Sequence, residues 1–204
     1  MSSVRPPIEG RRLSHQDLLG PLSLVTAPTG QAVTTDDAKL FLRVDHDDEN
    51  DVIDDAVKAA TEFCQEETGR QYLTASYTLR LRGWWMGPFT LPKPPMRSVT
   101  SITYIDTAGA TQTLAGTYYE SFAPLKGPGQ IVRLPFQVWP VHQADREYPV
   151  IVTFSAGYGT AADIPFRTRQ AILMATAWFY DHRDPGQLEL QAVRSLLAHE
   201  TWGL

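Results

Sequence analysis

The sequence predicts an α+β protein in which a helical core carries an inserted antiparallel β subdomain. Three observations predict it. Apolar residues recur at three- and four-residue spacing in residues 34–69, as on one face of a helix. Residues 71–160 are rich in strand and turn signals, and an apolar helical pattern returns in residues 163–183. The helical core would contain two N-terminal helices, a central buried helix and a C-terminal helix.

The composition is that of an ordinary globular protein, with 43% hydrophobic and 20% charged residues in a chain of 204. No apolar run approaches the ~20 residues that a membrane-spanning helix needs, so no membrane contact is expected. The single cysteine, Cys64, cannot form an intrachain disulfide. Because it falls on an apolar helix face, we expect it to be a small buried hydrophobe.

Residues 1–33 are predicted to form a flexible N-terminal arm. They contain several prolines, among them Pro6, Pro7, Pro21 and Pro28, with only a short helical pattern in between. Such a segment has few apolar residues to bury, and we expect it to become ordered only on a partner.

The first two helices are predicted from their capping residues. Thr34 or Thr35 can cap the first helix, whose apolar residues end at Val44. Asp47 or Asp48 can cap the second, and further carboxylates follow in its first turn, where the helix dipole favours negative charge.

The second helix has one apolar face and stops at Gly69, a residue that readily takes the left-handed conformation of a helix end. Its apolar residues are Val52, Ile53, Ala56, Val57, Ala60, Phe63 and Cys64. Phe63 and Trp178 are expected to be buried where this helix packs against the central one. Residues 34–70 and 163–183 would together make the helical core.

Charge is divided between the two parts of the chain. Residues 34–69 hold twelve acidic and three basic residues, whereas residues 70–154 hold eight basic and four acidic ones. The division fits either a solvated helix face or charge-complementary packing between neighbouring copies. The acidic helices have the wrong sign for binding phosphates.

The β-rich insertion is predicted over residues 71–160. Tyr77, Leu79 and Leu81 alternate with polar residues, as in a half-buried strand. Residues 99–105 pair with 112–114 in one predicted hairpin, and 118–122 with 130–134 in another, each joined by a glycine-containing turn. Residues 150–154 form the last predicted strand.

A turn-rich loop at residues 83–89 concentrates aromatic side chains. Its glycines and Pro88 predict an exposed tip, and clustered exposed aromatics usually mark an interaction site. Trp84, Trp85 and Phe89 are therefore candidate partner-binding residues.

The C-terminal segment, residues 187–204, is predicted to be a partner-docking helix. Asp184, Pro185 and Gly186 separate it from the central helix, which has Pro165 in its first turn. Its candidate partner-binding residues are Leu190, Val193, Leu196, Leu197 and Trp202. Apolar anchors at three- and four-residue steps are typical of a helix that lies in a partner's groove, although docking onto its own domain is the alternative.

No catalytic, cofactor-binding or metal-binding residues are predicted. The acidic run that starts at Asp45 lacks the Gly and Glu of a calcium loop and has Asn50 and Ala56 at those places. The five histidines lie far apart, and the serine in residues 154–157 lacks the flanking glycine of a nucleophile elbow. The chain is not expected to be an enzyme.

The two N-terminal helices carry the motif of a known family. The matching residues are Asp36, Ala38, Leu42, Arg43, Val44, Asp47, Asp48, Asp51, Ala60, Glu67, Thr68, Gly69 and Arg70. With the strand-rich segment and the helix that ends in His182 and Arg183, this order resembles the phage head–tail connector (head completion or adaptor) family, in its branch with a β-rich insertion. The segment after Arg183 departs from the family pattern.

The resemblance implies a structural virion protein at the head–tail interface, made in the cytoplasm of a host bacterium. It would form a homo-oligomeric ring of twelve copies under the portal protein of a phage or gene transfer particle. The ring would extend the DNA channel, let DNA pass without specific binding, and dock the next component, a stopper. The C-terminal end would reach toward the portal.

A second function class remains open, a β-rich carbohydrate-binding or hydrolytic module. Trp84, Trp85, Tyr118 and Tyr119 could form a stacking platform for sugars. A glycosidase would also need two carboxyl groups at a fixed separation. The acidic residues that the β region offers are Asp106, Glu120, Asp145 and Glu147.

Overall fold

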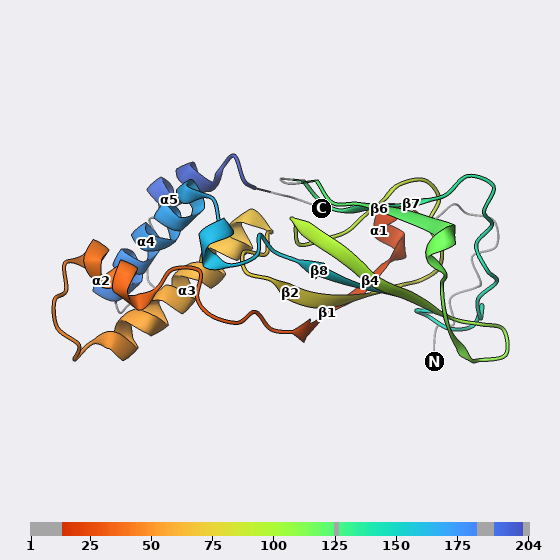
Figure 1. Ribbon diagram of the computed structural model, residues 1–204, viewed down its shortest axis with the longest axis horizontal. Coiled ribbons are helices and arrows are strands. Elements are labelled where there is room, and N and C mark those ends of the chain that lie inside the picture. The colour runs from red at the N-terminus through yellow and green to blue at the C-terminus, as the bar shows by residue number, and fades with distance from the viewer. Residues whose placement is uncertain (1–13, 125–126, 183–189, 202–204) are drawn as a thin grey trace, which may run out of the picture.

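The computed structural model describes residues 14–124, 127–182 and 190–201. The molecule is elongated, with helices at one end and strands at the other (Figure 1). The longer elements are β1 (Leu19–Thr26), α2 (Thr35–Leu42), α3 (Asn50–Thr68), β2 (Ala75–Leu81), β4 (Met96–Ile105), β8 (Val150–Ala156) and α4 (Phe166–Asp181). The shorter ones are α1 (His15–Leu18), β3 (Phe89–Thr90), β5 (Thr111–Thr113), β6 (Tyr119–Phe122), β7 (Gln130–Arg133) and α5 (Gln191–Leu197). The chain is thus an α+β protein.

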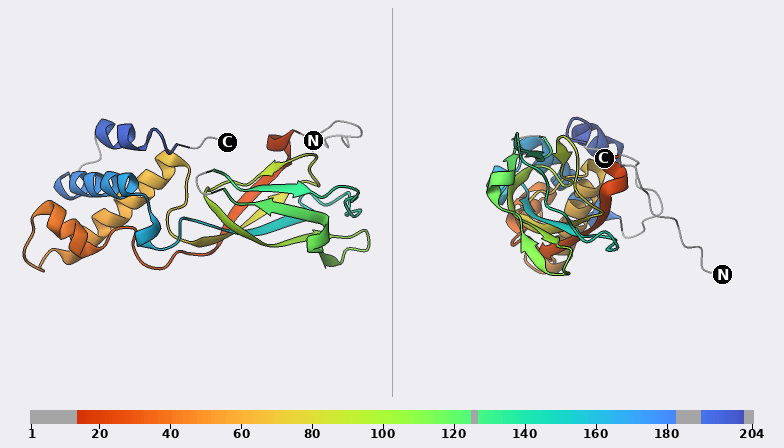
Figure 2. Two further views of the ribbon diagram at one scale, coloured as in Figure 1. Left: turned by 45° about the horizontal axis from the view of Figure 1, so that its top comes forward. Right: turned by 90° about the vertical axis from the view of Figure 1, so that its right-hand side faces the viewer.

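Two antiparallel sheets form the β part. One has the strand order β1-β2-β8-β4-β5 and the other β3-β7-β6. Phe89 of β3 and Ile131 of β7 lie in one buried core with Leu79 and Val152 of the larger sheet, so the two sheets close over a shared apolar interior. The left view in Figure 2 shows them as two layers beside the helices.

The predicted strands and hairpins are largely confirmed. Tyr77, Leu79 and Leu81 point into the core, and Tyr77 pairs with Phe154 of β8, where the two rings stack with centroids 5.8 Å apart. The β4–β5 and β6–β7 hairpins form at the predicted places. The alternation of apolar and polar residues, together with the turn residues, was sufficient to predict these hairpins, because each hairpin pairs two strands that are close in sequence.

The helices form a second core. α3 and α4 lie side by side, with Ala60, Cys64, Ile172 and Ala175 fully buried. Thr34 caps α2 by accepting a hydrogen bond from the Asp37 N–H at 3.1 Å, as predicted.

Two details of the helices differ from the sequence prediction. α3 begins after Glu49, and Asp47 instead accepts hydrogen bonds from Lys39 and Asn50, so the acidic turn is tied to α2 rather than capping α3. Phe63 and Trp178 are only half-buried. Both contact the ring of Phe179, whose centroid lies 6.3 Å from the ring centroid of Phe63 and 5.3 Å from that of Trp178.

The prediction of an unstructured arm over residues 1–33 is corrected from Ser14 onward. β1 pairs antiparallel with β2 along the edge of the larger sheet, and Leu18, Ala32 and Val33 are buried. Pro21 is compatible with an edge strand, where one side of the backbone needs no ladder hydrogen bond. Residues 1–13 lie outside the described residues.

The C-terminal helix also differs from its prediction. Leu190, Val193 and Leu197 of the α5 region are 4%, 1% and 1% exposed, because they pack onto the helical core of their own chain. The Arg194 guanidinium binds the Glu67 carboxylate through two hydrogen bonds of 3.1 Å. Leu196 is partly buried against the same core, and Trp202 lies outside the described residues.

The chain passes between the two cores three times, in residues 27–34, 69–74 and 157–165. Backbone hydrogen bonds join the last two crossings: Tyr158 N–H donates to Tyr72 C=O at 2.8 Å, and Thr74 N–H to Gly159 C=O at 3.1 Å. Gly157 has φ 122°, and a Cβ there would lie 2.4 Å from the Leu73 carbonyl oxygen. Only glycine fits at position 157. We call the junction formed by these three crossings the waist.

A buried polar cluster ties the C-terminal end to the waist. Arg70, 6% exposed, forms an ion pair with Glu200 at 3.4 Å. The Tyr158 hydroxyl donates to the Glu200 carboxylate at 3.1 Å, and burial raises the pKa of Tyr158 to about 12. The hydroxyl therefore stays protonated at neutral pH and keeps its role as a donor.

Candidate partner-binding surfaces

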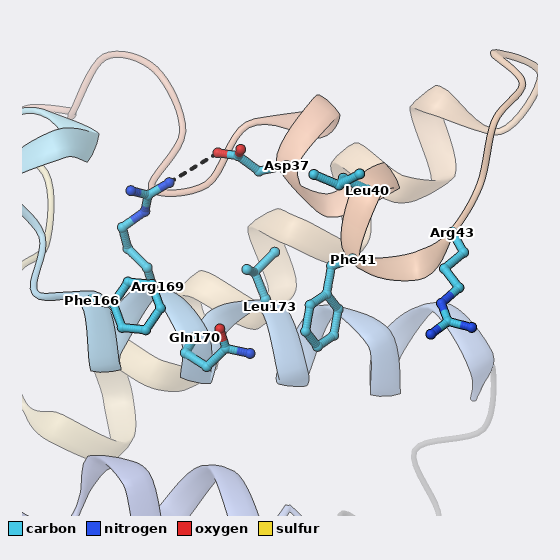
Figure 3. A pocket seen from close by; sticks show the side chains of 8 residues that line it. All are labelled: Asp37, Leu40, Phe41, Arg43, Phe166, Arg169, Gln170 and Leu173. Carbon is cyan, nitrogen blue, oxygen red and sulfur yellow. Dashed lines mark hydrogen bonds and ion pairs between the residues drawn. The ribbon is translucent and has the colours of Figure 1, made fainter.

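A groove lies between α2 and α4 at the helical end of the molecule (Figure 3). It encloses about 460 Å³ and is open to solvent. Its lining residues are Asp37, Leu40, Phe41, Arg43, Phe166, Arg169, Gln170 and Leu173. Two helices that are more than a hundred residues apart in sequence supply the two walls.

The groove exposes apolar side chains because α2 is a short helix with only one side on the core. Ala38 is fully buried, whereas Leu40 is 81% and Phe41 39% exposed. Phe166, in the first turn of α4, is 80% exposed. Large apolar side chains gathered in this way on a surface usually mark a contact with another protein.

The orientation of α2 is fixed by polar contacts with α3 and α4. The Thr35 hydroxyl donates a hydrogen bond to the Asp54 carboxylate of α3, and this bond together with one from Gln31 lowers the pKa of Asp54. Asp37 pairs with Arg169 of α4 at 3.1 Å. That exposed pair adds little stability, but it sets the register of the two walls.

The two ends of the groove carry arginines. Arg169 lies at one end and Arg43 at the other (Figure 3). Arg43 caps the C-terminus of α2 with φ 61°, a left-handed conformation that is uncommon for a side chain of its size. Apolar walls between two cations suit a protein segment with apolar anchors and carboxylates.

The groove holds no arrangement for catalysis. Its polar groups are one carboxylate in an ion pair, one amide and arginines, which together provide neither a nucleophile nor a general base. Among the described residues no cluster of His, Cys, Asp and Glu side chains could hold a metal ion. In the same part of the chain no helix has the length and apolarity to span a membrane.

The predicted aromatic tip is a buried corner. Trp85 is 2% exposed and Phe89 is fully buried, because both belong to the β core. Trp84 stacks on Trp139 with centroids 4.8 Å apart and planes at 10°. Of the predicted tip, Met86 carries the large exposed apolar side chain, at 76%. The predicted exposure of Trp85 and Phe89 is therefore wrong, and Trp84 is only partly exposed.

The same geometry removes the proposed sugar platform. One face of Trp84 is covered by Trp139, and Trp85 has no free face to offer. Tyr118 and Tyr119 are partly buried against the β core. Stacking on a sugar ring requires an aromatic face open to solvent, so no observation favours a carbohydrate module.

A second apolar surface, which was not predicted from the sequence, lies at the β end. Phe136, Val138 and Val141, in the loop between β7 and β8, are 104%, 76% and 75% exposed. The dense apolar residues between two prolines in this loop, Pro135 and Pro140, are the signal that could have found it.

Cys64 belongs to the core, as predicted, and has no place in either surface. It is fully buried on α3, and burial raises the pKa of its thiol to about 12. A thiol that stays protonated at neutral pH is a poor nucleophile and a poor metal ligand.

No known family model matches the chain, and no curated protein matches it. Several solved structures do match the chain. A chain from the neck of an empty GTA particle with C6 symmetry is 21% identical over 91% of this chain and 97% of that one, with a TM-score of 0.75. A chain from the virion of a native gene transfer agent (GTA) particle is 22% identical over 90% and 96%, with a TM-score of 0.76.

A third chain comes from the neck of a native GTA particle with C12 symmetry. It is 22% identical over 91% of this chain and 97% of that one, with a TM-score of 0.72. At these identities the likeness shows a shared fold. It covers both the helical and the β part of the chain, including the insertion that the sequence predicted.

Proposed function

We propose that this protein is a head–tail adaptor, a non-enzymatic structural subunit of the neck of a phage or gene transfer particle. One observation carries the proposal: the fold matches chains of such necks over nine-tenths or more of both partners. The family motif in residues 36–70 independently indicates the same role. The subunit would sit beneath the portal and dock the next component, a stopper.

A ring of copies follows from the same comparison. The similar neck structures were computed with C6 and C12 symmetry, and twelve copies of this chain around the channel would be compatible with both. In a ring each copy uses one surface to contact the next copy and a different surface to receive the previous one. The charge pattern of the helical end supplies such a pair.

The groove between α2 and α4 is proposed to receive the acidic turn of a neighbouring copy. Both features lie at the helical end, so side-by-side copies would hold them at the same height (Figure 1). The turn at residues 45–49 exposes Asp45, Asp47 and Asp48, of which Asp47 is already paired with Lys39. Exposed Arg43 lines the groove, and exposed Arg167 follows its lining residue Phe166 in sequence. Opposite charges that face each other across a ring contact fix its register and exclude other partners.

The DNA channel is proposed to be lined with acidic side chains. The outer face of α3 exposes Asp51, Asp55, Glu62 and Glu66, without an equal number of cations. A surface of this charge neutralises no phosphates, so DNA would pass without specific binding.

The proposal is tested in the organism that makes the particle. Deletion of the gene should leave DNA-filled heads without tails, and the wild-type chain should be found in purified particles by mass spectrometry. Tailed, infectious or transducing particles from the deletion strain would refute the proposal.

The ring contact is tested by Leu40→Ser and Arg43→Glu. Both residues are exposed, so each variant should melt like the wild-type chain but should be depleted from particle necks. Val52→Ser, at another exposed apolar position (53%) on α3, is the control and should be incorporated normally. Normal incorporation of all three variants would show that the groove is not the contact.

A further inference from the structure

The β end of the molecule presents an exposed apolar tip, formed by Met86, Phe136, Val138 and Val141. Each of the four side chains is 75% exposed or more. The loop between β7 and β8 lies at the end opposite the helices (Figure 1). The tip is therefore separate from the groove and faces another direction.

The backbone at Phe136 holds the ring outward in an unfavourable conformation. Gln137 N–H donates to Leu134 C=O at 3.3 Å, which closes a turn with Pro135 and Phe136 at its centre. Phe136 has φ 64°, the left-handed value that such a turn ordinarily assigns to glycine. Strained backbone conformations of this kind cluster at functional sites.

Contacts among Trp84, Trp85 and Trp139 attach the tip to the β core. The Trp139 indole N–H donates to the Trp85 carbonyl at 2.9 Å, and the Trp84 indole N–H to the Pro140 carbonyl at 2.7 Å. The stacked Trp84 and Trp139 rings fill the space between the two loops. The apolar residues thus cannot fold back onto the core, and little ordering remains to be done when a partner binds.

We infer that this tip docks into an apolar recess on a different protein of the particle, in the ring that adjoins this one. The inference rests on the proposed function. The four exposed side chains of the tip are apolar, so the recess that receives them must be apolar as well.

The size of the tip argues for a ring as the partner. Four side chains of this kind expose on the order of 500 Å². A stable one-to-one complex buries about 800 Å² on each side, so a single tip would hold a partner weakly. Tips repeated around a ring bind together, and their combined affinity can exceed that of one contact by a factor of about a hundred or more.

The same argument disfavours two other occupants. A pair of copies joined tip to tip would bury too little area to be a stable dimer. A membrane surface would require a cationic border for the anionic headgroups. Here Arg146 lies between Asp145 and Glu147, so the loop carries no net positive charge.

Phe136→Gly is the decisive variant. Glycine adopts the left-handed conformation freely, so the variant should fold with an equal or higher melting temperature while it loses the aromatic ring. Val141→Ser is a second variant that leaves the turn unchanged. Leu24→Ser is the matched control, since Leu24 is 53% exposed on β1.

Each variant is expressed in the deletion strain, and purified heads are assayed for this chain by immunoblot and for tails by electron microscopy. We expect Phe136→Gly to be present in heads in the wild-type amount and to reduce the tailed fraction at least tenfold. The control should leave that fraction unchanged. A wild-type tailed fraction with both tip variants would overturn the inference.

Three further results would also overturn it, for different reasons. Wild-type chain absent from particles would remove the proposed function itself. A dimer of the purified chain in sedimentation equilibrium, lost on Phe136→Gly, would assign the tip to a second copy. Cosedimentation with phosphatidylcholine–phosphatidylglycerol vesicles that depends on Phe136, with normal tails on the variant, would assign it to a membrane.

Discussion

Leu197→Ala tests whether α5 belongs to the core. Leu197 is 1% exposed and is one of three apolar anchors, with Leu190 and Val193, that hold α5 on the helical core. A helix of seven residues is not stable on its own in water, so α5 depends on these contacts. Removal of one anchor should therefore loosen the whole helix.

The expected cost follows from the burial of the side chain. Truncation of a fully buried leucine to alanine lowers the free energy of unfolding by about 2–5 kcal/mol. In a domain of this size each kcal/mol shifts the melting temperature by about 2–4 °C, which gives a shift of about 4–20 °C. The Arg194–Glu67 pair, whose side chains are 39% and 32% exposed, cannot offset that loss.

Two measurements check the prediction. Thermal unfolding should report the lower melting temperature, and hydrogen exchange should show loss of protection in a peptide that covers α5, where Arg194 N–H donates to Leu190 C=O at 2.9 Å. Leu196→Ala is the control, because Leu196 is only partly buried and should cost clearly less. Unchanged melting and unchanged exchange in Leu197→Ala would refute the docked position of α5.

Three further predictions concern other parts of the molecule. Trp85→Ala should lower the free energy of unfolding by about 3–5 kcal/mol, seen in urea denaturation, because the ring is buried in the β core; an unchanged midpoint would contradict the buried corner. Cys64 should not react with a disulfide reagent at pH 8 until urea unfolds the chain. Because folding raises its pKa from 9.0 to about 12, its contribution to stability is complete below pH 9 and is lost as pH rises toward 12, a loss that Cys64→Ala should remove. Gly157→Ala should prevent the two cores from joining properly at the waist, whereas Gly116→Ala, where a Cβ meets no atom within 4 Å, should be tolerated in the same melting assay.

Local patterns predicted most of the secondary structure. The helix that ends at Gly69 was marked by its apolar periodicity and by a glycine that does adopt φ 66°. The β4–β5 hairpin was marked by the turn that includes Gly109, which has φ 84°. In such cases the interactions that stabilise the element lie within a few residues of each other.

One strand that depends on a distant partner, β1, was not predicted. β1 has the sequence LGPLSLVT, which looks irregular because of Gly20 and Pro21, and it becomes a strand only through pairing with β2. A Cβ at Gly20 would lie 2.3 Å from the Tyr148 ring, so the glycine serves a close approach between two distant segments. Periodicity within one segment carries no information on that approach.

The candidate surfaces show the same limit. Trp84 and Trp85 could be recognised as interacting residues, but their partner, Trp139, lies more than fifty residues away in the same chain. The tryptophans are covered by one another, and the exposed apolar side chains at this end are those of Phe136 and its neighbours. The groove likewise exists only once α2 and α4, which are far apart in sequence, lie next to each other.

The chain passes through the waist three times. This affects the order in which the protein can fold during synthesis and the way in which its two halves can evolve. β1 is synthesised first, yet it must wait until β2 has emerged, after α2 and α3. α3 in turn waits for α4, which follows the whole β part. Neither half is a continuous stretch of polypeptide, so neither can be exchanged between relatives by a single recombination event, and each half must evolve in the presence of the other.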